Sequence, residues 1–564
     1  MPFSFLRLRR RYKDLVRLRH ILGVFFKYGF YQFIEQVNLA RLIPFRKRLL
    51  ERFPYIDRAF PERLRHAFEE LGPSFIKLAQ ILSSRPDLIT KPYADEFKKL
   101  QDEVPPFRFE EVRRIVKEDL GAEIEELFKE FEVRPMAAAS IAQVHGAVLK
   151  SGEEVVVKIQ RPRIKEIIET DIDILRFIAD LMDRYLAEAE FFNPKGIVEE
   201  FSKTVKKELN FREEARNLNK FRRNFEGHKY IYIPKLYSQY LTERIIVMER
   251  IHGVRIDNIS EIARLGFDRS HIAKIGLEAY LKMIFEDGFF HGDPHPGNIF
   301  VMPDGRIGLV DFGIVGYLTP ELMESLAQAF VSLVKQDFDN LIEQYIDLGF
   351  VSEEIDIDTF KRDFKADLMD FLVPLYGATI AEINFAEYLD TLTHLAIKHK
   401  LRIPSDFLLV NKSLLILDSI ARELDPSFNF IVVAEPYASK LIRSRYSPKR
   451  LYERARRNFD DVTAFAFGAP RQLRLLLRKT LRDELHFKLT HLGLEKFVRD
   501  IDRSANRLSF SVIVAAIIMG SSILTLSNIG GKVFDVPLFG AIGFLIAFVM
   551  GLWLLISIIR SGRL

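Results

Sequence analysis

The apolar and polar positions follow different spacings in different parts of the chain, and each spacing predicts a kind of element. Residues 1–105 have helical spacing, with breaks expected at Pro44, Pro54 and Pro61. Four short runs rich in β-branched or apolar residues predict strands: 153–162, 231–237, 243–253 and 305–313. Residues 196–225 predict one helix, and the pattern after 270 is mostly helical. The chain is therefore expected to form a small α+β lobe followed by a larger helical lobe.

Two uncharged runs follow near the end, at 508–531 and 536–559, separated only by KVFD. Each run is long enough to cross about 30 Å of hydrocarbon as a helix, so together they predict a transmembrane hairpin. The alternative is a buried hairpin of a soluble protein. Arginines flank both ends of the pair, at positions 503, 507, 560 and 563, and the positive-inside rule then places the body in the cytoplasm, at the cytoplasmic membrane.

Composition and charge narrow the possible functions. The 564 residues include no cysteine, which excludes disulfides and thiolate metal sites. A formal net charge of +5 is modest for a nucleic-acid binder, and no nucleic acid is expected as a partner. The basic residues gather near the two ends. Residues 5–20 contain seven Lys and Arg among apolar residues, which predicts either an amphipathic helix on an anionic membrane surface or an ordinary solvated helix.

A run of polar residues, HGDPHPGN at 291–298, is followed by LVDFG at 309–313. Phosphoryl-transfer enzymes use such residue types together: one carboxylate orients the attacking hydroxyl, while an amide and a second carboxylate hold Mg²⁺ on the phosphates. The order and spacing are those of the protein-kinase motifs. We therefore predict Asp293 as a catalytic residue and Asn298 and Asp311 as Mg²⁺ ligands. The alternative is a polar turn between helices.

Lys158 lies within the apolar strand VVVKI, where a cation is costly without a partner. We predict that it anchors the α- and β-phosphates of ATP, whereas the alternative is an edge-strand lysine that reaches solvent. Its predicted carboxylate partner is Glu208. Four other glutamates of the predicted helix remain as alternatives: Glu199, Glu200, Glu213 and Glu214.

The predicted nucleotide site has two further parts. The segment VMERI falls where a hinge is expected, with Met248 behind the adenine and the backbone of Glu249 and Ile251 at its edge. The loop MAAASIAQVHG at 136–146 has alanines where a phosphate-covering loop normally has glycines. The loop residues expected to contact the nucleotide are Ala137, Ala138, Ala139, Ser140 and Ile141.

Together, AAASIAQVH, VVVKIQRP, HGDPHPGNIF and LVDFG resemble the UbiB family of atypical kinase-like proteins, which includes bacterial UbiB and the mitochondrial ADCK proteins. The resemblance also covers LGPSFIKLAQILSSRPDLI and LQDEVPP, which ordinary kinases lack. It implies an α+β, two-lobed, atypical protein-kinase-like fold with a helical N-terminal extension and a C-terminal transmembrane hairpin. The expected parts are a helical extension at 1–105, an N-lobe at 106–250, a C-lobe at 251–435, a basic helical juxtamembrane region at 436–507 and two transmembrane helices at 508–564.

The resemblance also implies a K-x-G-Q segment that folds over the active site, matched here by Lys77 and Gln80, which we add to the expected catalytic residues. Ala79 stands where the family usually has glycine. Alanine is the better helix former, so the helix is expected to persist. The family's E-x-D pair reads Glu208, Leu209 and Asn210 here, so the second carboxylate is missing.

The expected substrate is a small molecule, a lipid or water. Gly292 replaces the arginine that binds an activation-loop phosphate in protein kinases, and only five residues separate Gly313 from the predicted helix start at Thr319. No peptide platform is therefore expected. The resemblance implies a role in isoprenoid quinone biosynthesis. The expected partners are membrane lipids, isoprenoid quinone precursors, proteins of a quinone-biosynthesis complex and a second copy of the chain.

Three functions are compatible with these residues: a membrane-anchored Mg²⁺-dependent atypical kinase or ATPase in quinone biosynthesis, a small-molecule phosphotransferase of the aminoglycoside-kinase or choline-kinase type, and a nucleotide-binding scaffold without turnover. The first is preferred. The alanine-rich loop, the Lys77 segment and the hairpin count against the second, and the complete set of Lys158, Asp293, Asn298 and Asp311 counts against the third.

Overall fold

A computed structural model describes the greater part of the chain, and two compact units are distinguished, Met1–Leu451 and Tyr452–Leu564. The described residues are 3–37, 39, 59–83, 89–100, 104–185, 193–334, 337–347, 357–372, 391, 394–395, 398–399, 401, 405–445, 494–526, 532–533 and 536–560. Pro44, Pro54 and most of the expected juxtamembrane region lie outside these residues.

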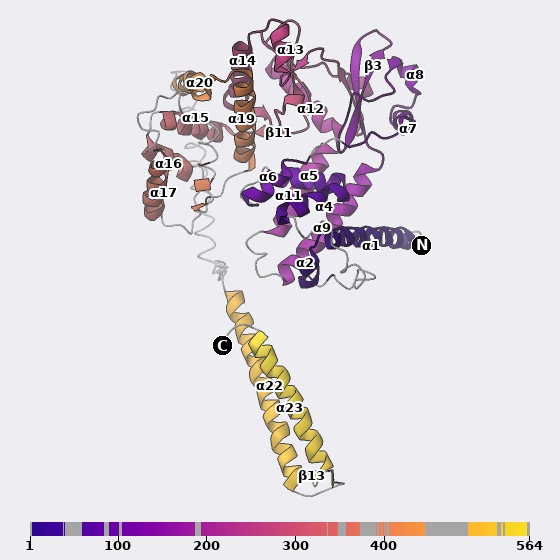
Figure 1. Ribbon diagram of the computed structural model, residues 1–564, viewed down its shortest axis with the longest axis vertical. Helices are drawn as coiled ribbons and strands as arrows, with labels where there is room; N and C mark the ends of the chain where they lie inside the picture. Colours follow the sequence, from indigo (N-terminus) through magenta and orange to yellow (C-terminus); the bar gives the residue numbers. More distant parts are fainter. Residues whose placement is uncertain are drawn as a thin grey trace, which may run out of the picture. The chain divides into compact units, whose positions relative to one another are not determined.

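The first unit begins with helices, as the spacing predicts (Figure 1). They are α1 (Phe3–Lys27), α2 (Tyr31–Gln36), α4 (Phe60–Leu71), α5 (Pro73–Ser83) and α6 (Lys91–Phe97). Pro61 lies in the first turn of α4, where the absent N–H costs nothing, so it starts a helix rather than breaking one. The second half of α1 packs inward: Ile21 and Val24 are buried, and Arg17 donates to the buried Asp171 at 2.7 and 3.0 Å. This half of α1 therefore belongs to the core.

Next comes an antiparallel sheet, covered by two short helices. The elements are α7 (Phe109–Leu120), α8 (Ile124–Leu127), β1 (Phe128–Phe131), β2 (Ala137–Ala138), β3 (Ala142–Leu149), β4 (Glu154–Gln160) and β6 (Ile245–Glu249). The strand order is β1-β3-β4-β6, with β2 paired to β3. In β4, Val155, Val157 and Ile159 are fully buried on one face, so the alternation of a strand turns Lys158 to the opposite face.

Three helices follow β4 along the chain: α9 (Ile164–Tyr185), α11 (Pro194–Glu208) and α12 (Phe211–Asn224). The single helix predicted for 196–225 is wrong, because the structure breaks it after Glu208. Asn210 adopts an extended conformation and its side chain accepts a hydrogen bond from the N–H of Arg212, which caps α12. The N–H of Phe211 donates to the carbonyl of Glu243 instead of to the helix.

The helical lobe also contains two small groups of strands. The order β5-β10-β9-β7 is formed by β5 (Ile231–Tyr232), β10 (Ile307–Leu309), β9 (Ile299–Val301) and β7 (Val254–Arg255), and β8 (Phe289–His291) pairs with β11 (Val315–Tyr317). The helices are α13 (Ile259–Arg264), α14 (Arg269–Lys282), α15 (Pro320–Val334), α16 (Phe338–Asp347), α17 (Ile357–Leu372), α19 (Ser405–Leu424) and α20 (Phe430–Arg445). Thr319 caps α15 as predicted, since its hydroxyl accepts from the N–H of Leu322.

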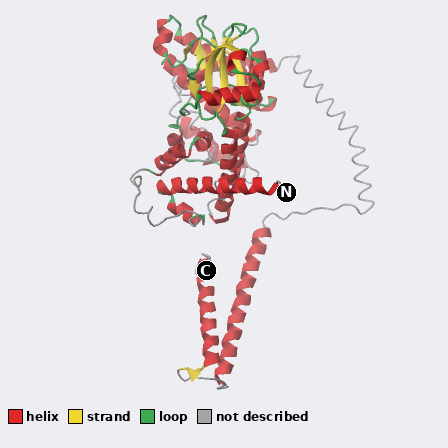
Figure 2. Cartoon of the chain, turned by 90° about the vertical axis from the view of Figure 1, so that its right-hand side faces the viewer, coloured by secondary structure: helices red, strands yellow, loops and turns green. Residues whose placement is uncertain are grey.

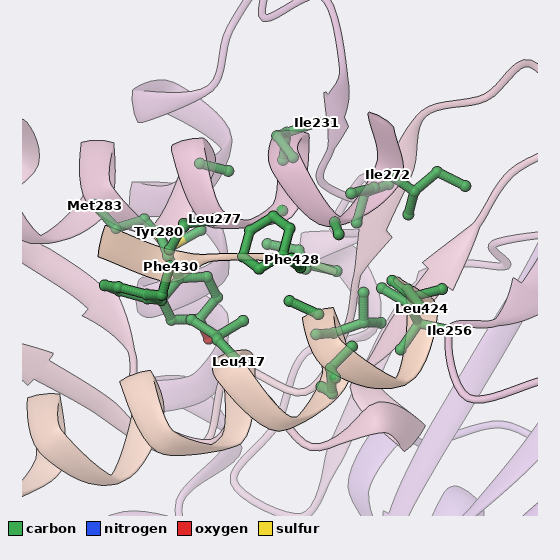
Figure 3. Close-up of a pocket in the computed structure, with 18 residues that line it drawn as sticks. Ile231, Ile256, Ile272, Leu277, Tyr280, Met283, Leu417, Leu424, Phe428 and Phe430 are labelled. Atoms are coloured by element: carbon green, nitrogen blue, oxygen red, sulfur yellow. The ribbon is translucent and has the colours of Figure 1, made fainter. Parts of the chain in front are cut away.

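Helix α19 packs along α14 through apolar side chains (Figure 3). Leu417 and Leu424 of α19 face Leu277 and Tyr280 of α14, and Phe428 also lines the interface. The interface encloses a cavity of about 20 Å³, which is room for about one water molecule. The packing is therefore nearly complete, and α19 is held firmly on this lobe.

The second unit is a helical hairpin of α22 (Leu494–Leu526) and α23 (Leu538–Arg560), joined through two short strands, β12 (Lys532–Val533) and β13 (Val536–Pro537). The two helices lie side by side (Figures 1 and 2). Phe510 and Trp553 are in ring contact at 5.4 Å, and a side chain at Gly543 would overlap Ser521. Residues 505–526 are long and apolar enough to cross a membrane, and 541–555 form a shorter apolar stretch.

Candidate active site

The catalytic loop predicted at 291–298 follows β8 and is held by its own hydrogen bonds. The buried His291 accepts from the N–H of Asp293 at its Nδ1 and donates from its Nε2 to the carbonyl of Val310. The side-chain amide of Asn298 donates to the carbonyl of Asp293 at 3.1 Å. The loop is thus fixed internally, with the Asp293 side chain about one-third exposed.

The register of β9 and β10 brings the two predicted metal ligands together. Ile299 pairs with Leu309, and the N–H of Val310 donates to the carbonyl of Asn298. Asn298 precedes one strand and Asp311 follows the other, so the two side chains start from neighbouring strand ends. Asp311 has a φ of +60°, a conformation that side chains rarely adopt, and its carboxylate accepts from the N–H of Gly313.

Lys158 reaches both halves of the site. Its ammonium donates to both carboxylate oxygens of Glu214 at 2.9 and 3.0 Å and to Asp311 at 3.2 Å. The predicted partner, Glu208, is therefore wrong as the partner of Lys158, and one of the alternatives is correct. The break before α12 explains the error, because it places Glu208 and Glu214 on different helices.

The carboxylates of Glu214 and Asp311 share the Lys158 ammonium, and their pKa values are shifted in opposite directions. Burial raises the pKa of Glu214 to about 7, against the attraction of Lys158 and with added repulsion from Asp311. Desolvation by the surrounding protein atoms would also raise the pKa of Asp311, but Lys158 and the Gly313 N–H outweigh it and lower the pKa to about 2. Burial would lower the pKa of Lys158, yet the two carboxylates raise it. Asp311 is therefore ionised at neutral pH, as a metal ligand must be.

Helix α12 also holds the segment around Asp311. Asn217 donates from its side chain to the carbonyl of Phe312 at 2.9 Å. Phe221 lies 5.0 Å from the fully buried Phe312 ring, 4.5 Å from Phe289 and 6.3 Å from His291. We call these four rings the aromatic cluster. It joins α12, the catalytic loop and Phe312 in one packed unit.

Lys77 and Glu208 form a second, separate ion pair. Their charged atoms are 3.4 Å apart, and the side chains are 12% and 8% exposed. Helix α5 continues through Ala79, which is fully buried, so alanine fits where glycine was expected. Gln80 lies three residues beyond Lys77 on the same helix. Asn210 takes no part in the pair and caps α12 instead.

The alanine-rich loop is a strand pair with a tight turn and not a helix. Ala137 and Ala138 form β2, and Ala139 to Ile141 make the turn into β3. The Arg161 guanidinium donates to the carbonyls of Ala139, Val104 and Pro105. The buried Ser140 hydroxyl has no hydrogen-bond partner among the described residues. Arg161 thus holds the turn in place, and the turn contains one buried hydroxyl without a described hydrogen-bond partner.

The predicted hinge residues lie at the end of β6. Met248 is buried opposite Val156 of β4, and Ile251 packs against Gly308. The Glu249 carboxylate accepts from the Tyr232 hydroxyl at 2.7 Å, which fixes the position of its side chain.

Sequence reasoning missed contacts that helix α19 makes with the catalytic loop. The Lys412 ammonium lies 3.2 Å from the Asp293 carboxylate, although 119 positions separate them. A Cβ on Gly292 would lie 2.9 Å from a methyl group of Leu409. No sequence motif identifies Lys412, but the glycine at 292 indicated that another segment packs closely against the loop.

The described residues contain no cluster of three or more His, Cys, Asp or Glu that could hold a metal alone. Mg²⁺ usually takes only one or two protein ligands, with substrate phosphates and waters completing its shell. An ionised Asp311 beside Asn298 fits that requirement. The site can therefore hold Mg²⁺ on a bound phosphate compound.

Three family models match the chain: the ABC1 atypical kinase-like domain over 99–345, the UbiB helical domain over 368–429 and the ABC1/UbiB kinase-like C-terminal domain over 492–560. A Clostridium pasteurianum protein, named only as an uncharacterized protein in the hydrogenase 1 5' region, is 34% identical over 89% of this chain and 94% of its own. A Pseudomonas fluorescens (strain SBW25) protein named probable protein kinase UbiB is 38% identical over 69% of this chain and 72% of its own.

A further Pseudomonas fluorescens protein of that name, from strain Pf0-1, is 36% identical over 72% of this chain and 76% of its own. A solved structure of a Mycobacterium tuberculosis protein with erythromycin gives a TM-score of 0.45 at 24% identity, covering 65% of this chain and 92% of that one. The predicted α+β kinase-like fold and family are confirmed. The chain belongs to the UbiB family of atypical kinase-like proteins.

Proposed function

We propose that this protein is a membrane-anchored atypical kinase or ATPase that binds Mg²⁺ and ATP and supports isoprenoid quinone biosynthesis. The observation that carries the proposal is the joint placement of Lys158, Glu214 and Asp311, with Asn298 beside Asp311 on the neighbouring strand end. A cation, a metal-binding carboxylate and an amide in this arrangement serve phosphoryl transfer.

Each residue then has a distinct task. Lys158, held by Glu214, binds the α- and β-phosphates, while Asp311 and Asn298 supply oxygen ligands for Mg²⁺. Bound Mg²⁺ would neutralise charge on the phosphates. Asp293 orients the acceptor hydroxyl or a water and accepts its proton. The pinned turn of Ala137 to Ile141 covers the phosphates.

Two features favour a non-peptide acceptor. Only the short β11 segment separates Gly313 from α15, and α19 packs directly on Gly292. A polypeptide substrate has no extended segment to lie on at this edge. A lipid or other small acceptor, or water, needs none.

The hairpin of α22 and α23 supports a membrane location, since 505–526 is long and apolar enough to span a bilayer. The name UbiB of the bacterial relatives and the family resemblance support the link to isoprenoid quinones. The expected partners are accordingly membrane lipids and quinone precursors.

Phosphate release from ATP by the full-length protein tests the proposal. We expect release that requires Mg²⁺, is lost with EDTA and is stimulated by vesicles or by a phenolic mimic of a quinone precursor. Asp293→Asn should abolish it, while Asp257→Asn, a similarly exposed surface aspartate, should not. Nucleotide binding without any turnover would favour a scaffold. Stimulation by soluble amines or choline in place of lipid would favour a small-molecule phosphotransferase.

A further inference from the structure

Helix α19 meets the catalytic loop along one face. Leu409 packs on Gly292, the Lys412 ammonium lies 3.2 Å from the Asp293 carboxylate, and the Ser413 hydroxyl donates to the carbonyl of His291 at 3.4 Å. Residues 409, 412 and 413 follow the spacing of neighbours on a helix surface. The contact is therefore a continuous docking of α19 on the loop and not one chance approach.

Gly292 makes this approach possible. A Cβ at this position would lie 2.9 Å from side-chain carbons of both Leu409 and Ile314, closer than van der Waals contact permits. The residue between His291 and Asp293 consequently has no side chain, and the loop offers no cation of its own at that point. Lys412 comes instead from the part of the chain that matches the UbiB helical domain.

The other lysines of the site are already engaged. Lys158 is bound by Glu214 and Asp311, and Lys77 lies against Glu208. Among the described residues, Lys412 is the only one that forms an ion pair with Asp293. We propose that Lys412 is a catalytic cation, whose ammonium contacts the transferred γ-phosphoryl group and Asp293 together. This inference rests on the proposed function.

A purely structural role explains the pair poorly. The two side chains are 33% and 34% exposed, and ion pairs that water reaches add little to stability. Helix α19 is already anchored by the apolar interface with α14 (Figure 3). A catalytic role explains the pair better, because phosphoryl transfer requires a cation close to the carboxylate that orients the acceptor, and Lys412 lies beside Asp293.

The chemistry balances without any further reactant. The acceptor oxygen forms a bond to the γ-phosphorus, the bond from that phosphorus to the β–γ bridging oxygen breaks, and ADP leaves. The acceptor proton passes to the Asp293 carboxylate. Lys412 keeps its proton throughout; it separates the negative carboxylate from the negative phosphoryl oxygens and offsets the charge on them. Its long, flexible stem allows contact with both.

Three variants of the full-length protein test this role. Lys412→Met removes the charge and keeps the apolar stem, and Lys412→Arg restores a cation. Lys361→Met is the matched control, since Lys361 is a similarly exposed lysine that pairs with Glu343 on α16. Each variant is compared with wild type for kcat of phosphate release and for affinity for ADP and for the non-hydrolysable analogue AMP-PNP.

We expect Lys412→Met to lower kcat about 100–1,000-fold and to weaken AMP-PNP binding severalfold, with ADP binding unchanged, because only the analogue carries a γ-phosphoryl group. Lys412→Arg should recover a large part of kcat, and Lys361→Met should match wild type. A kcat for Lys412→Met within twofold of wild type overturns the inference. A Lys412→Met variant that fails to fold also overturns it, because Lys412 would then be a structural residue that the fold requires.

The proposed function can fail separately. If the wild-type protein forms no ADP from ATP in the presence of Mg²⁺, with or without vesicles and the phenolic mimic, the proposed function is wrong. The ratio of AMP-PNP to ADP affinity then still decides the role of Lys412. An unchanged ratio in Lys412→Met overturns it, and a lowered ratio supports a γ-phosphoryl contact in a protein that binds ATP without turnover.

Discussion

Replacing Glu214 by glutamine separates the stability of the site from its activity. Removing one partner of a buried ion pair usually destabilises a protein by about 3–5 kcal/mol, because the other charge is left alone. Here Lys158 would keep Asp311 at 3.2 Å. The carboxylate of Glu214 is itself unfavourable in the folded state, since burial raises its pKa from 4.5 to about 7. We therefore expect Glu214→Gln not to destabilise the protein at pH 8.

The raised pKa of Glu214 determines how the stability of the folded protein changes with pH. Stability from this group is fully present below pH 4.5, where both folded and unfolded forms are protonated, and is lost as the pH rises through about 7. At about 1.4 kcal/mol for each pH unit between the two values, the ionised side chain costs the folded state up to about 3 kcal/mol at pH 8. Glutamine avoids this cost. The variant should melt above wild type at pH 8, by up to about 3–6 °C, and the difference should disappear near pH 4.5.

Activity should change in the opposite direction. Without a charged partner on α12, Lys158 turns to Asp311 and competes with Mg²⁺ for it, so phosphate release should fall at least ~10-fold. The assays are thermal melting and phosphate release at both pH values, with Glu213→Gln as the control on the same helix. If Glu214→Gln melts below wild type at pH 8, the pair with Lys158 is net stabilising and the reasoning is refuted.

Four further predictions concern other parts of the chain. Asp311→Asn should abolish Mg²⁺-dependent nucleotide binding, measured by calorimetry, with the fold retained. A chain ending at Arg503 should no longer resist alkaline extraction from membranes. Gly292→Ala should cost about 1–3 kcal/mol in a melting assay, because the added methyl overlaps two side chains of the loop and α19. Lys77→Ala should change the rate of phosphate release, and Ala138→Gly should change the preference between ATP and ADP.

Each of these has a contrary outcome. Wild-type Mg²⁺ dependence in Asp311→Asn would mean that the metal ligand is wrongly assigned. Extraction resistance of the shortened chain would show that the hairpin is not the anchor. Normal stability of Gly292→Ala would mean that α19 can withdraw from the loop. Wild-type behaviour of both Lys77→Ala and Ala138→Gly would remove the active-site roles of the α5 segment and of the alanine-rich loop.

The structure brings several residues singled out by short motifs close together. Asn298 and Asp311 come together because β9 and β10 pair directly between them, and two strands of that length are a local structure. Asp293 is joined to Asn298 by a hydrogen bond within the same loop. Lys158 was identified because a lysine in an apolar strand requires a partner. The identity of that partner depended on where a helix ends, and the N-cap at Asn210 was not recognised in a run without proline or glycine.

Contacts between distant segments could not be predicted in this way. Lys412 belongs to an ordinary amphipathic helix, and only the packing of α19 on α14 brings it to Asp293. The turn at Ala139 presented a similar difficulty. Alanines favour a helix locally, but Arg161 and the pairing of β2 with β3 decide the conformation. In both places tertiary contacts outweigh the local sequence preference.

The aromatic cluster has a consequence for inhibitor design. In protein kinases the packing of the phenylalanine after the metal-binding aspartate sets the active or the inactive form, so a ligand that needs this ring to move must displace it. Here Phe312 is fully buried against Phe221 and His291, and its carbonyl is bound by Asn217. Expelling it would separate α12 from the catalytic loop and expose three further rings to water. Selective ligands should therefore be sought among molecules that fit the closed arrangement, such as those that use the pinned alanine turn and the Lys77 helix.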